Sequence, residues 1–214
     1  MDKGRLGRIV QSESLEWGDN AALGYHHAAA GDMDAQWATY FVPFQKRFDP
    51  DLRACADFAA GFGRNTRKLL AGGAHHVTMI DVNPDCIERL SQTLSGPGAT
   101  PFRNSGHDLA GLGGDQFSFF YSFDAMVHFD LELVLAYMPE IFRTMRPGAL
   151  AFLHHSNHTG NPGGDFRQSP HWRNYMSADL FKHIAIKSGF DVVQQEVIAW
   201  GEPDLDCITV LKKP

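Results

Sequence analysis

Apolar and polar positions follow two periodicities from about residue 50 to the end of the chain. Short, almost wholly apolar runs predict buried strands, and runs with an apolar side chain every three or four residues predict helices. Alternating strands and helices are typical of an α/β fold with a mostly parallel sheet. The expected strands are 53–58, 77–81, 100–103, 117–122, 149–154, 190–199 and 205–212. The expected helices are 64–71, 84–94, 131–145 and 178–188.

Two features modify this simple alternation. Pro139 lies inside the third helix, where we expect a kink or an early break because proline removes a backbone hydrogen bond. Residues 201–204 join the last two strands, and a parallel crossover needs a dozen or more residues. The chain is therefore expected to end in an antiparallel hairpin.

Residues 1–50 form a separate N-terminal helical extension or lid in this interpretation, and residues 51–214 form the main domain. Between Met33 and Phe44, aromatic residues recur at helical spacing, and Pro43 is expected to end or kink that helix. The aromatic face predicts core packing, or a lid that also covers a ligand. It could pack on its own domain or on a second copy in a homodimer.

Charge and cysteine content limit the classes of partner. The formal net charge is -6 and no basic run occurs, which argues against nucleic-acid binding. The three cysteines are scattered, as expected for free thiols in a reducing compartment. No apolar stretch approaches the roughly 20 residues of a membrane span, and the N-terminus does not resemble a secretion signal. We therefore expect a soluble, cytoplasmic protein.

The candidate chemistry begins at the end of the first expected strand. Residues 54–60 lead into the turn Gly61-Phe62-Gly63, a helical pattern follows, and the second strand ends at Asp81. In α/β sheets this arrangement binds an adenosine, because the backbone approaches the ligand at the glycines and a carboxylate accepts from the ribose hydroxyls. The sequence therefore predicts a cofactor that contains a nucleoside.

The order of elements, the glycine turn and the terminal hairpin resemble the class I S-adenosylmethionine-dependent methyltransferase family over about residues 45–214. Segments 122–128 and 154–157 are similar to those of a bacterial subgroup that acts on small molecules. The resemblance implies a three-layer, doubly wound, Rossmann-like fold with a mostly parallel seven-stranded sheet, an antiparallel C-terminal hairpin and a helical N-terminal extension. It also implies S-adenosyl-L-methionine as cofactor and S-adenosyl-L-homocysteine as product.

Individual roles follow from the family motif. The acid at the position of Asp57 lies near the methionine end of the cofactor, Asp81 holds the ribose, and Asp108 accepts from the adenine amino group. Ser122 lines the sulfonium side. Ala59 occupies the first glycine position of the motif, and we expect its φ to stay negative because it carries a side chain. The full set of cofactor-binding residues implied by the resemblance is Asp57, Ala59, Gly61, Gly63, Asn65, Asp81, Val82, Asp108, Leu109, Ser122 and Phe123.

Histidines are the candidate catalytic residues, because imidazole titrates near neutrality and catalytic groups in open α/β sheets follow the carboxyl ends of strands. Strand alternation sends His154 and His155 to opposite faces. We expect His155 to be the base and His128 to be the second candidate. A metal held by the histidines around 154–158 is an alternative that their spacing disfavours, so no metal is expected.

The expected acceptor is small and hydroxylated, such as a sugar, and oxygen is the favoured nucleophile. Alternatives are N- or C-methylation of a small metabolite, a nicotinamide-dependent oxidoreductase, and a non-catalytic cofactor-binding module. Polar and aromatic side chains of the N-terminal segment and of the loop 156–175 are candidate acceptor contacts. The main candidates are Trp37, His154, Asn157 and Arg173, and Tyr25, His26 and Gln36 are further candidates.

Overall fold

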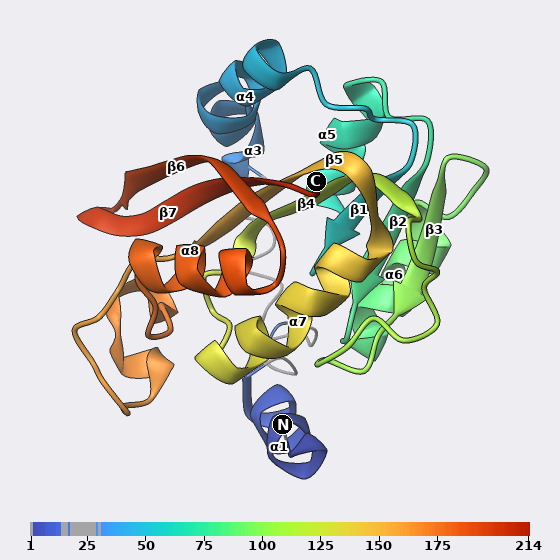
Figure 1. Ribbon diagram of the computed structural model, residues 1–214. Coiled ribbons are helices and arrows are strands. Elements are labelled where there is room, and N and C mark those ends of the chain that lie inside the picture. The colour runs from blue at the N-terminus through green and yellow to red at the C-terminus, as the bar shows by residue number, and fades with distance from the viewer. Residues whose placement is uncertain (1, 14–16, 18–28, 30) are drawn as a thin grey trace.

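The protein forms one seven-stranded sheet between two layers of helices (Figure 1). The computed structural model describes residues 2–13, 17, 29 and 31–214. The strand order is β3-β2-β1-β4-β5-β7-β6, and β7 runs antiparallel to both of its neighbours. The predicted mostly parallel sheet with a terminal hairpin is confirmed. The strands are β1 (Cys55–Phe58), β2 (Val77–Asp81), β3 (Ala99–Arg103), β4 (Phe117–Met126), β5 (Met145–Ser156), β6 (Asp191–Trp200) and β7 (Glu202–Lys212).

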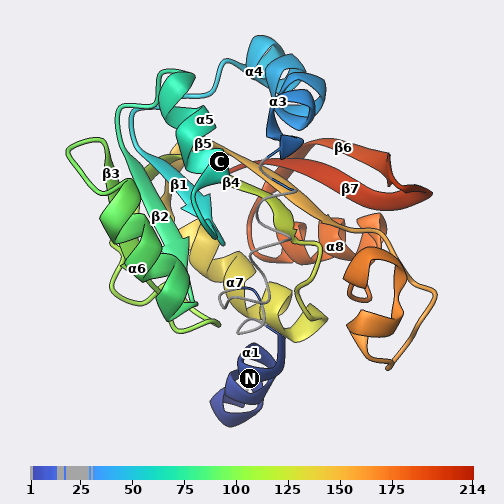
Figure 2. The same ribbon diagram turned by 180° about the vertical axis from the view of Figure 1, so that it is seen from behind.

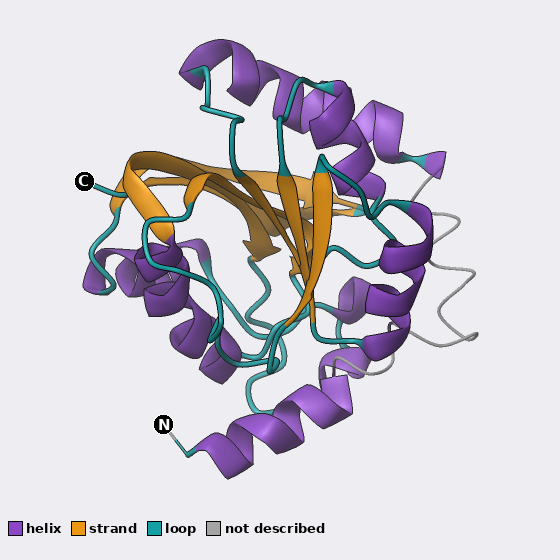
Figure 3. Ribbon diagram, turned by 90° about the vertical axis from the view of Figure 1, so that its right-hand side faces the viewer, coloured by secondary structure: helices purple, strands orange, loops and turns teal. Residues whose placement is uncertain are grey.

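The helices divide between the two faces of the sheet (Figures 2 and 3). One hydrophobic core joins the sheet to α1, α7 and α8, and the other joins it to η3, α4, α5 and α6. No helix in the described part of the chain is long and apolar enough to cross a membrane. The helical segments are α1 (Lys3–Glu13), α3 (Met33–Gln36), η3 (Trp37–Phe41), α4 (Val42–Phe48), α5 (Arg64–Ala71), α6 (Pro84–Thr93), α7 (Leu131–Thr144), η4 (Phe166–Gln168), η5 (Pro170–Trp172) and α8 (Ala178–Lys187).

Neither proline ends its helix, although the sequence predicted that each would end, break or kink one. The helical path continues through Pro43, because η3 is a π-helical segment and Pro43 then falls in the first turn of α4, where proline is tolerated. α7 likewise runs unbroken as Leu131–Thr144 with Pro139 inside it. The aromatic face around η3 packs on the sheet of its own chain, with the Phe41 ring 5.6 Å from that of Phe152. This face is part of the core and is not left for a second copy to cover.

Strand β4 is longer than predicted, and its extension shapes the site. It reaches Met126, and its register against β5 shifts between Ser122 and Met126. Within this irregular stretch Asp124 has a φ of 53°, a left-handed conformation that is uncommon for residues other than glycine. Asp124 within this stretch and His128 just after it are among the residues that line the cavity described below.

Candidate cofactor and acceptor site

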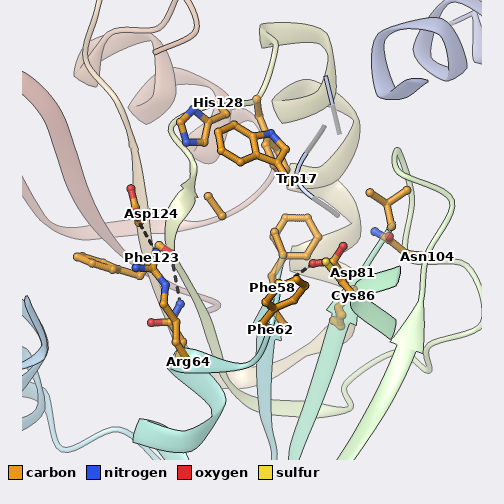
Figure 4. A pocket seen from close by; sticks show the side chains of 18 of the residues that line it. Trp17, Phe58, Phe62, Arg64, Asp81, Cys86, Asn104, Phe123, Asp124 and His128 are labelled. Atoms are coloured by element: carbon orange, nitrogen blue, oxygen red, sulfur yellow. Dashed lines mark hydrogen bonds and ion pairs between the residues drawn. The ribbon is translucent and has the colours of Figure 1, made fainter. Parts of the chain in front are cut away.

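A cavity of about 380 Å³ lies at the carboxyl ends of β1, β2 and β4. The sheet reverses its direction of growth between β1 and β4, which is where ligands bind in open α/β sheets. Figure 4 shows Asp81 and Asn104 on one side of this cavity, Arg64 and Asp124 on another, and His128 with Trp17 near each other. The cavity therefore has a part near β2 and a part near the end of β4, each with its own polar groups.

The turn after β1 brings backbone to the cavity. Gly61 and Gly63 adopt φ values of 54° and 78°, and a side chain at Gly63 would collide with Leu94 and Leu90 of the neighbouring helix end. Ala59 has a φ of 57°, so the expectation of a negative φ at this position is wrong. The turn keeps the left-handed geometry of a glycine at Ala59 and accepts the strain of a methyl group there.

Asp81 is the charged anchor at the end of β2. Its carboxylate accepts hydrogen bonds from the backbone N–H groups of Gly61 (2.8 Å) and Asn83 (2.9 Å), one on each oxygen. Burial raises the pKa of Asp81, and these two backbone donors act against that shift. Each carboxylate oxygen retains acceptor capacity, so the group can accept from a pair of ligand hydroxyls.

Asn104, rather than Asp108, supplies a polar group to the same part of the cavity. The Asp108 carboxylate accepts from the Ser105 hydroxyl (2.7 Å) and is not among the cavity-lining residues. Asn104 directly follows β3, and its Nδ2 donates to the Tyr137 hydroxyl (2.8 Å). Its Oδ1 is buried and has no partner within the described chain. An amino group of a bound nucleobase is a donor of the kind this oxygen lacks.

The other predicted cofactor residues divide between the cavity wall and the layer behind it. Asn65, Val82 and Phe123 line the cavity together with the turn 59–61. Gly63, Leu109 and Ser122 do not line it, and the Ser122 hydroxyl donates to the Phe58 carbonyl (2.9 Å). These residues support the wall without reaching the cavity themselves.

Asp57 is fully buried behind the turn. One of its oxygens accepts from the Thr66 hydroxyl (2.5 Å), and the other has no partner within the described chain. Burial raises the pKa of Asp57 to about 6, although the Thr66 hydrogen bond opposes the shift. The carboxyl group therefore ties β1 to α5 and is not itself part of the cavity wall.

A buried charged network stands behind the end of β4. Asp124 pairs with Arg64 (2.7 Å) and lies 3.7 Å from Arg173, which forms two hydrogen bonds to Asp206 (2.9 and 2.6 Å). Burial alone would raise the pKa of Asp124, but the charges of Arg64 and Arg173 hold it below its ordinary value. The predicted acceptor contact Arg173 is thus buried in this network and does not line the cavity.

His154 belongs to the same network. Its Nδ1 accepts from the Asp124 backbone N–H (3.1 Å), so its Nε2 carries the proton and donates to Asp206 (3.0 Å). The imidazole is therefore neutral with a defined tautomer. The histidine supports the strained backbone at Asp124 and is not a cavity residue, contrary to its predicted contact with the acceptor.

The two candidate bases have opposite placements. His155 stacks on Phe181 of α8 at 3.7 Å and hydrogen-bonds to Thr209, on the face of the sheet away from the cavity. Burial lowers its pKa to about 3. The structure thus does not place His155 as a base, and the predicted opposite orientations of His154 and His155 are confirmed by their packing against Phe123 and Phe181.

His128 lines the cavity, where Trp17 stacks against it at 4.5 Å. Its Nδ1 donates to the Trp172 carbonyl (2.8 Å), and its Nε2 is buried with no partner within the described chain. Burial, assisted by the charge of Arg173, lowers the pKa of His128 to about 4. At neutral pH the ring is therefore uncharged, and Nε2 is a hydrogen-bond acceptor.

The remaining predicted acceptor contacts lie elsewhere. Trp37 packs on Phe41 in the core, and Asn157 caps α8 through its Oδ1 (2.8 Å to the Ala178 N–H). Gln36 is absent from the cavity wall, whereas Tyr25 and His26 lie outside the described residues. Sequence reasoning missed Glu13, Trp17, Arg64 and Asn104 as cavity residues. One sequence signal could have identified Asn104, because it is a polar residue that directly follows a predicted strand.

Known proteins with related sequences or structures were compared with the chain. Residues 56–148 match the sequence profile of a family described as "Methyltransferase domain". No curated protein sequence matches the chain. A 1,6-didemethyltoxoflavin-N1-methyltransferase of Burkholderia thailandensis is similar in structure over 100% of this chain and 91% of its own, with a TM-score of 0.70 and 16% identity.

Two further structures are similar at comparable levels. An S-adenosylmethionine-dependent methyltransferase of Leishmania major has 14% identity and a TM-score of 0.68, covering 98% of this chain and 82% of its own. One from Mesorhizobium loti has 15% identity and a TM-score of 0.63, covering 80% and 96%. At sequence identities this low, the structural likeness shows that the folds are alike and does not extend to substrate or mechanism.

The sequence match and the strand order together define a class I methyltransferase domain. Residues 56–148 thus carry a methyltransferase domain, and this match supports the predicted S-adenosylmethionine-dependent methyltransferase with S-adenosylmethionine as its cofactor. The family match sets aside the nicotinamide-dependent oxidoreductase. The cavity fits this cofactor, because the Asp81 carboxylate and the unpartnered Asn104 Oδ1 are acceptors for the hydroxyl and amino groups of an adenosine.

Proposed function

We propose that the enzyme methylates an oxygen atom of a small hydroxylated acceptor that binds beside His128. The observation that carries this proposal is the buried, unpartnered Nε2 of His128 in the cavity wall. A neutral nitrogen acceptor at this place pairs with a hydroxyl or N–H donor and not with a carboxylate. The aromatic surface of Trp17 beside it suits the apolar face of a sugar ring or of a planar ring.

The proposed roles of the chain's own groups follow from their positions. Asp81 and Asn104 hold the adenosine, and the turn at Ala59 and Gly61 lets the backbone approach it. When bound, the cofactor supplies a methyl group on a cationic sulfur, which is already a good leaving group. The protein then has to align the acceptor, exclude water and receive the acceptor's proton.

Two steps test this function. The wild-type enzyme should be thermally stabilised by S-adenosylhomocysteine, because a ligand that binds the native state shifts unfolding by mass action. With S-adenosylmethionine bearing a labelled methyl group, a panel of sugars, phenols and amino compounds should yield a labelled product, and mass spectrometry of that product locates the methyl group. Labelling of hydroxyl compounds supports the proposal, whereas labelling of nitrogen or carbon alone refutes the O-methylation part of it.

The structure from Burkholderia thailandensis keeps N-methylation as a second candidate. That protein is an N1-methyltransferase seen with 1,6-didemethyltoxoflavin, and it covers the whole of this chain. A planar heteroaromatic acceptor would also suit the wall formed by Trp17 and His128. The amino compounds in the panel distinguish this candidate from the first.

A further inference from the structure

Glu13 is a titratable group in the cavity wall that the sequence did not single out. It is the last residue of α1, and its carboxylate lies over the turn that follows β4. The Asn174 side chain donates to both Glu13 oxygens (3.3 Å each), and the Asp130 backbone N–H donates at 3.3 Å. All three hydrogen bonds are long, so the carboxylate is placed by its neighbours but is only weakly neutralised by them.

The position of Glu13 is tied to that of His128. The same Asn174 Nδ2 that donates to Glu13 also donates to the His128 carbonyl (3.2 Å). Glu13 and His128 therefore belong to one polar unit in the part of the cavity near the end of β4. Gly106 helps to seat α1 there, since a side chain at that glycine would collide with Val10. Figure 3 shows α1 beyond the ends of the strands.

We propose that Glu13 is the general base of the methyl transfer and that Asn174 positions it. In this step the acceptor's O–H bond breaks and its proton goes to a Glu13 oxygen. The freed oxygen forms a bond to the methyl carbon, and the electron pair of the sulfur–methyl bond returns to the sulfur and cancels its positive charge. The proposal rests on the proposed O-methylation.

The electrostatic surroundings suit this role better at Glu13 than at His128. Burial and the nearby charge of Asp130 raise the pKa of Glu13 to about 7, whereas Asn174 and Arg167 act in the opposite direction. A base whose pKa is near the working pH is both available and able to hold a proton. His128, with its pKa lowered to about 4, can accept a hydrogen bond but retains a proton poorly. It is therefore suited to orient the acceptor.

The test compares the wild type with Glu13→Gln and with the matched control Glu132→Gln. Glu132 pairs with Arg5 and so touches α1, but it is not part of the cavity wall. We expect Glu13→Gln to lower kcat by about 10²–10⁴-fold. The wild-type kcat/KM should rise with pH through a pKa near 7, and this limb should be absent in Glu13→Gln. Glu132→Gln should retain both the rate and the limb.

A second readout does not depend on turnover. In protein labelled with ¹³C at the glutamate carboxyls, one resonance should titrate near pH 7 and be missing in Glu13→Gln. S-adenosylhomocysteine affinity, measured by calorimetry, should be the same in both proteins. A Glu13 titration near its ordinary value of 4.5, or a Glu13→Gln variant with the wild-type rate, overturns the proposal. If the wild type itself labels no hydroxyl compound, the proposed function fails, and the role of Glu13 fails with it.

Discussion

Replacing Ala59 by glycine should stabilise the protein, although it removes a methyl group. Ala59 is the first residue of the turn after β1, and its φ of 57° lies in the left-handed region. In this region the Cβ of an L-residue is crowded by the following carbonyl oxygen, at a cost of roughly 1–2 kcal/mol. Glycine carries no Cβ and adopts the same φ without this penalty.

The opposing term comes from the unfolded chain. Glycine has more conformational freedom there than alanine, which disfavours folding by about 0.4–1 kcal/mol. The difference predicts a net gain of about 0.5–1 kcal/mol for Ala59→Gly. In a chain of this size that gain corresponds to a rise in melting temperature of roughly 1–4 °C.

Differential scanning calorimetry of Ala59→Gly beside Ala60→Gly isolates the effect of backbone conformation. Ala60 is the adjacent residue, is 3% exposed and is not among the residues with positive φ. Its replacement loses a buried methyl group and adds unfolded-state entropy, so it should destabilise by about 1–2 kcal/mol. Two shifts of opposite sign support the reasoning. A loss of stability in Ala59→Gly equal to that in Ala60→Gly would refute it.

Three other predictions address the charged groups. Asp81→Asn should weaken S-adenosylhomocysteine binding by about 10–100-fold, because hydrogen bonds to a charged acceptor contribute roughly 1.5–3 kcal/mol, and calorimetry that finds unchanged affinity would remove Asp81 from the cofactor site. Arg173→Met should lower the free energy of unfolding, measured in urea, by about 3–5 kcal/mol, because it leaves the buried Asp206 without its bidentate partner. A loss below about 1 kcal/mol would contradict the interpretation that Arg173 and Asp206 form a buried ion pair. The pKa of Glu13 is raised to about 7 in the folded protein. The favourable contribution of the protonated carboxyl group to the free energy of unfolding is therefore fully present below pH 4.5 and is lost as the pH rises toward about 7. The melting temperature of the wild type should therefore fall relative to Glu13→Gln across this window, and parallel curves would show that the carboxyl group is not perturbed.

The fold was predictable because its signals are local and repeated. The apolar run 77–81 and the helical pattern 64–71 coincide with β2 and α5 as the structure has them. Ser177 caps α8 by accepting from the Leu180 N–H. The short connection before β7 excluded a parallel crossover, so even the direction of the last strand followed from chain length.

The errors arose where contacts distant in sequence override local preference. Pro43 was expected to end or kink a helix, but the helical path continues, because the π-helical turn before it moves it to a position where no backbone donor is needed. Ala59 was expected to avoid positive φ, but Gly61 is held by Asp81 from another strand, and the turn is shaped by that bond. The bond from Gly61 to Asp81 spans 20 positions in the sequence, so it is not visible in a window of neighbouring residues.

Side-chain roles were harder to predict than backbone elements. His155 has the residue type and the strand-end position of a base, yet the same alternation that separates it from His154 turns it toward α8. Asp108 matched a family position, but Ser105 supplies it with a nearby local partner and Asn104 lines the cavity in its place. Residue type and spacing therefore identified the region of the site, and tertiary packing selected which side chains reach it.

Asp124 connects the two parts of the cavity. Its strained backbone gives its N–H to His154, while its carboxylate pairs with Arg64 from the start of α5 and lies near Arg173 from the loop before α8. Non-glycine residues with positive φ persist only where their surroundings hold them in place. Here α5 holds Asp124 through Arg64, and the loop before α8 holds it through Arg173. A shift of either arginine would thus move the end of β4 and with it Phe123 and His128. We therefore expect the buried network to help align the proposed acceptor with the cofactor, which an in-line displacement requires.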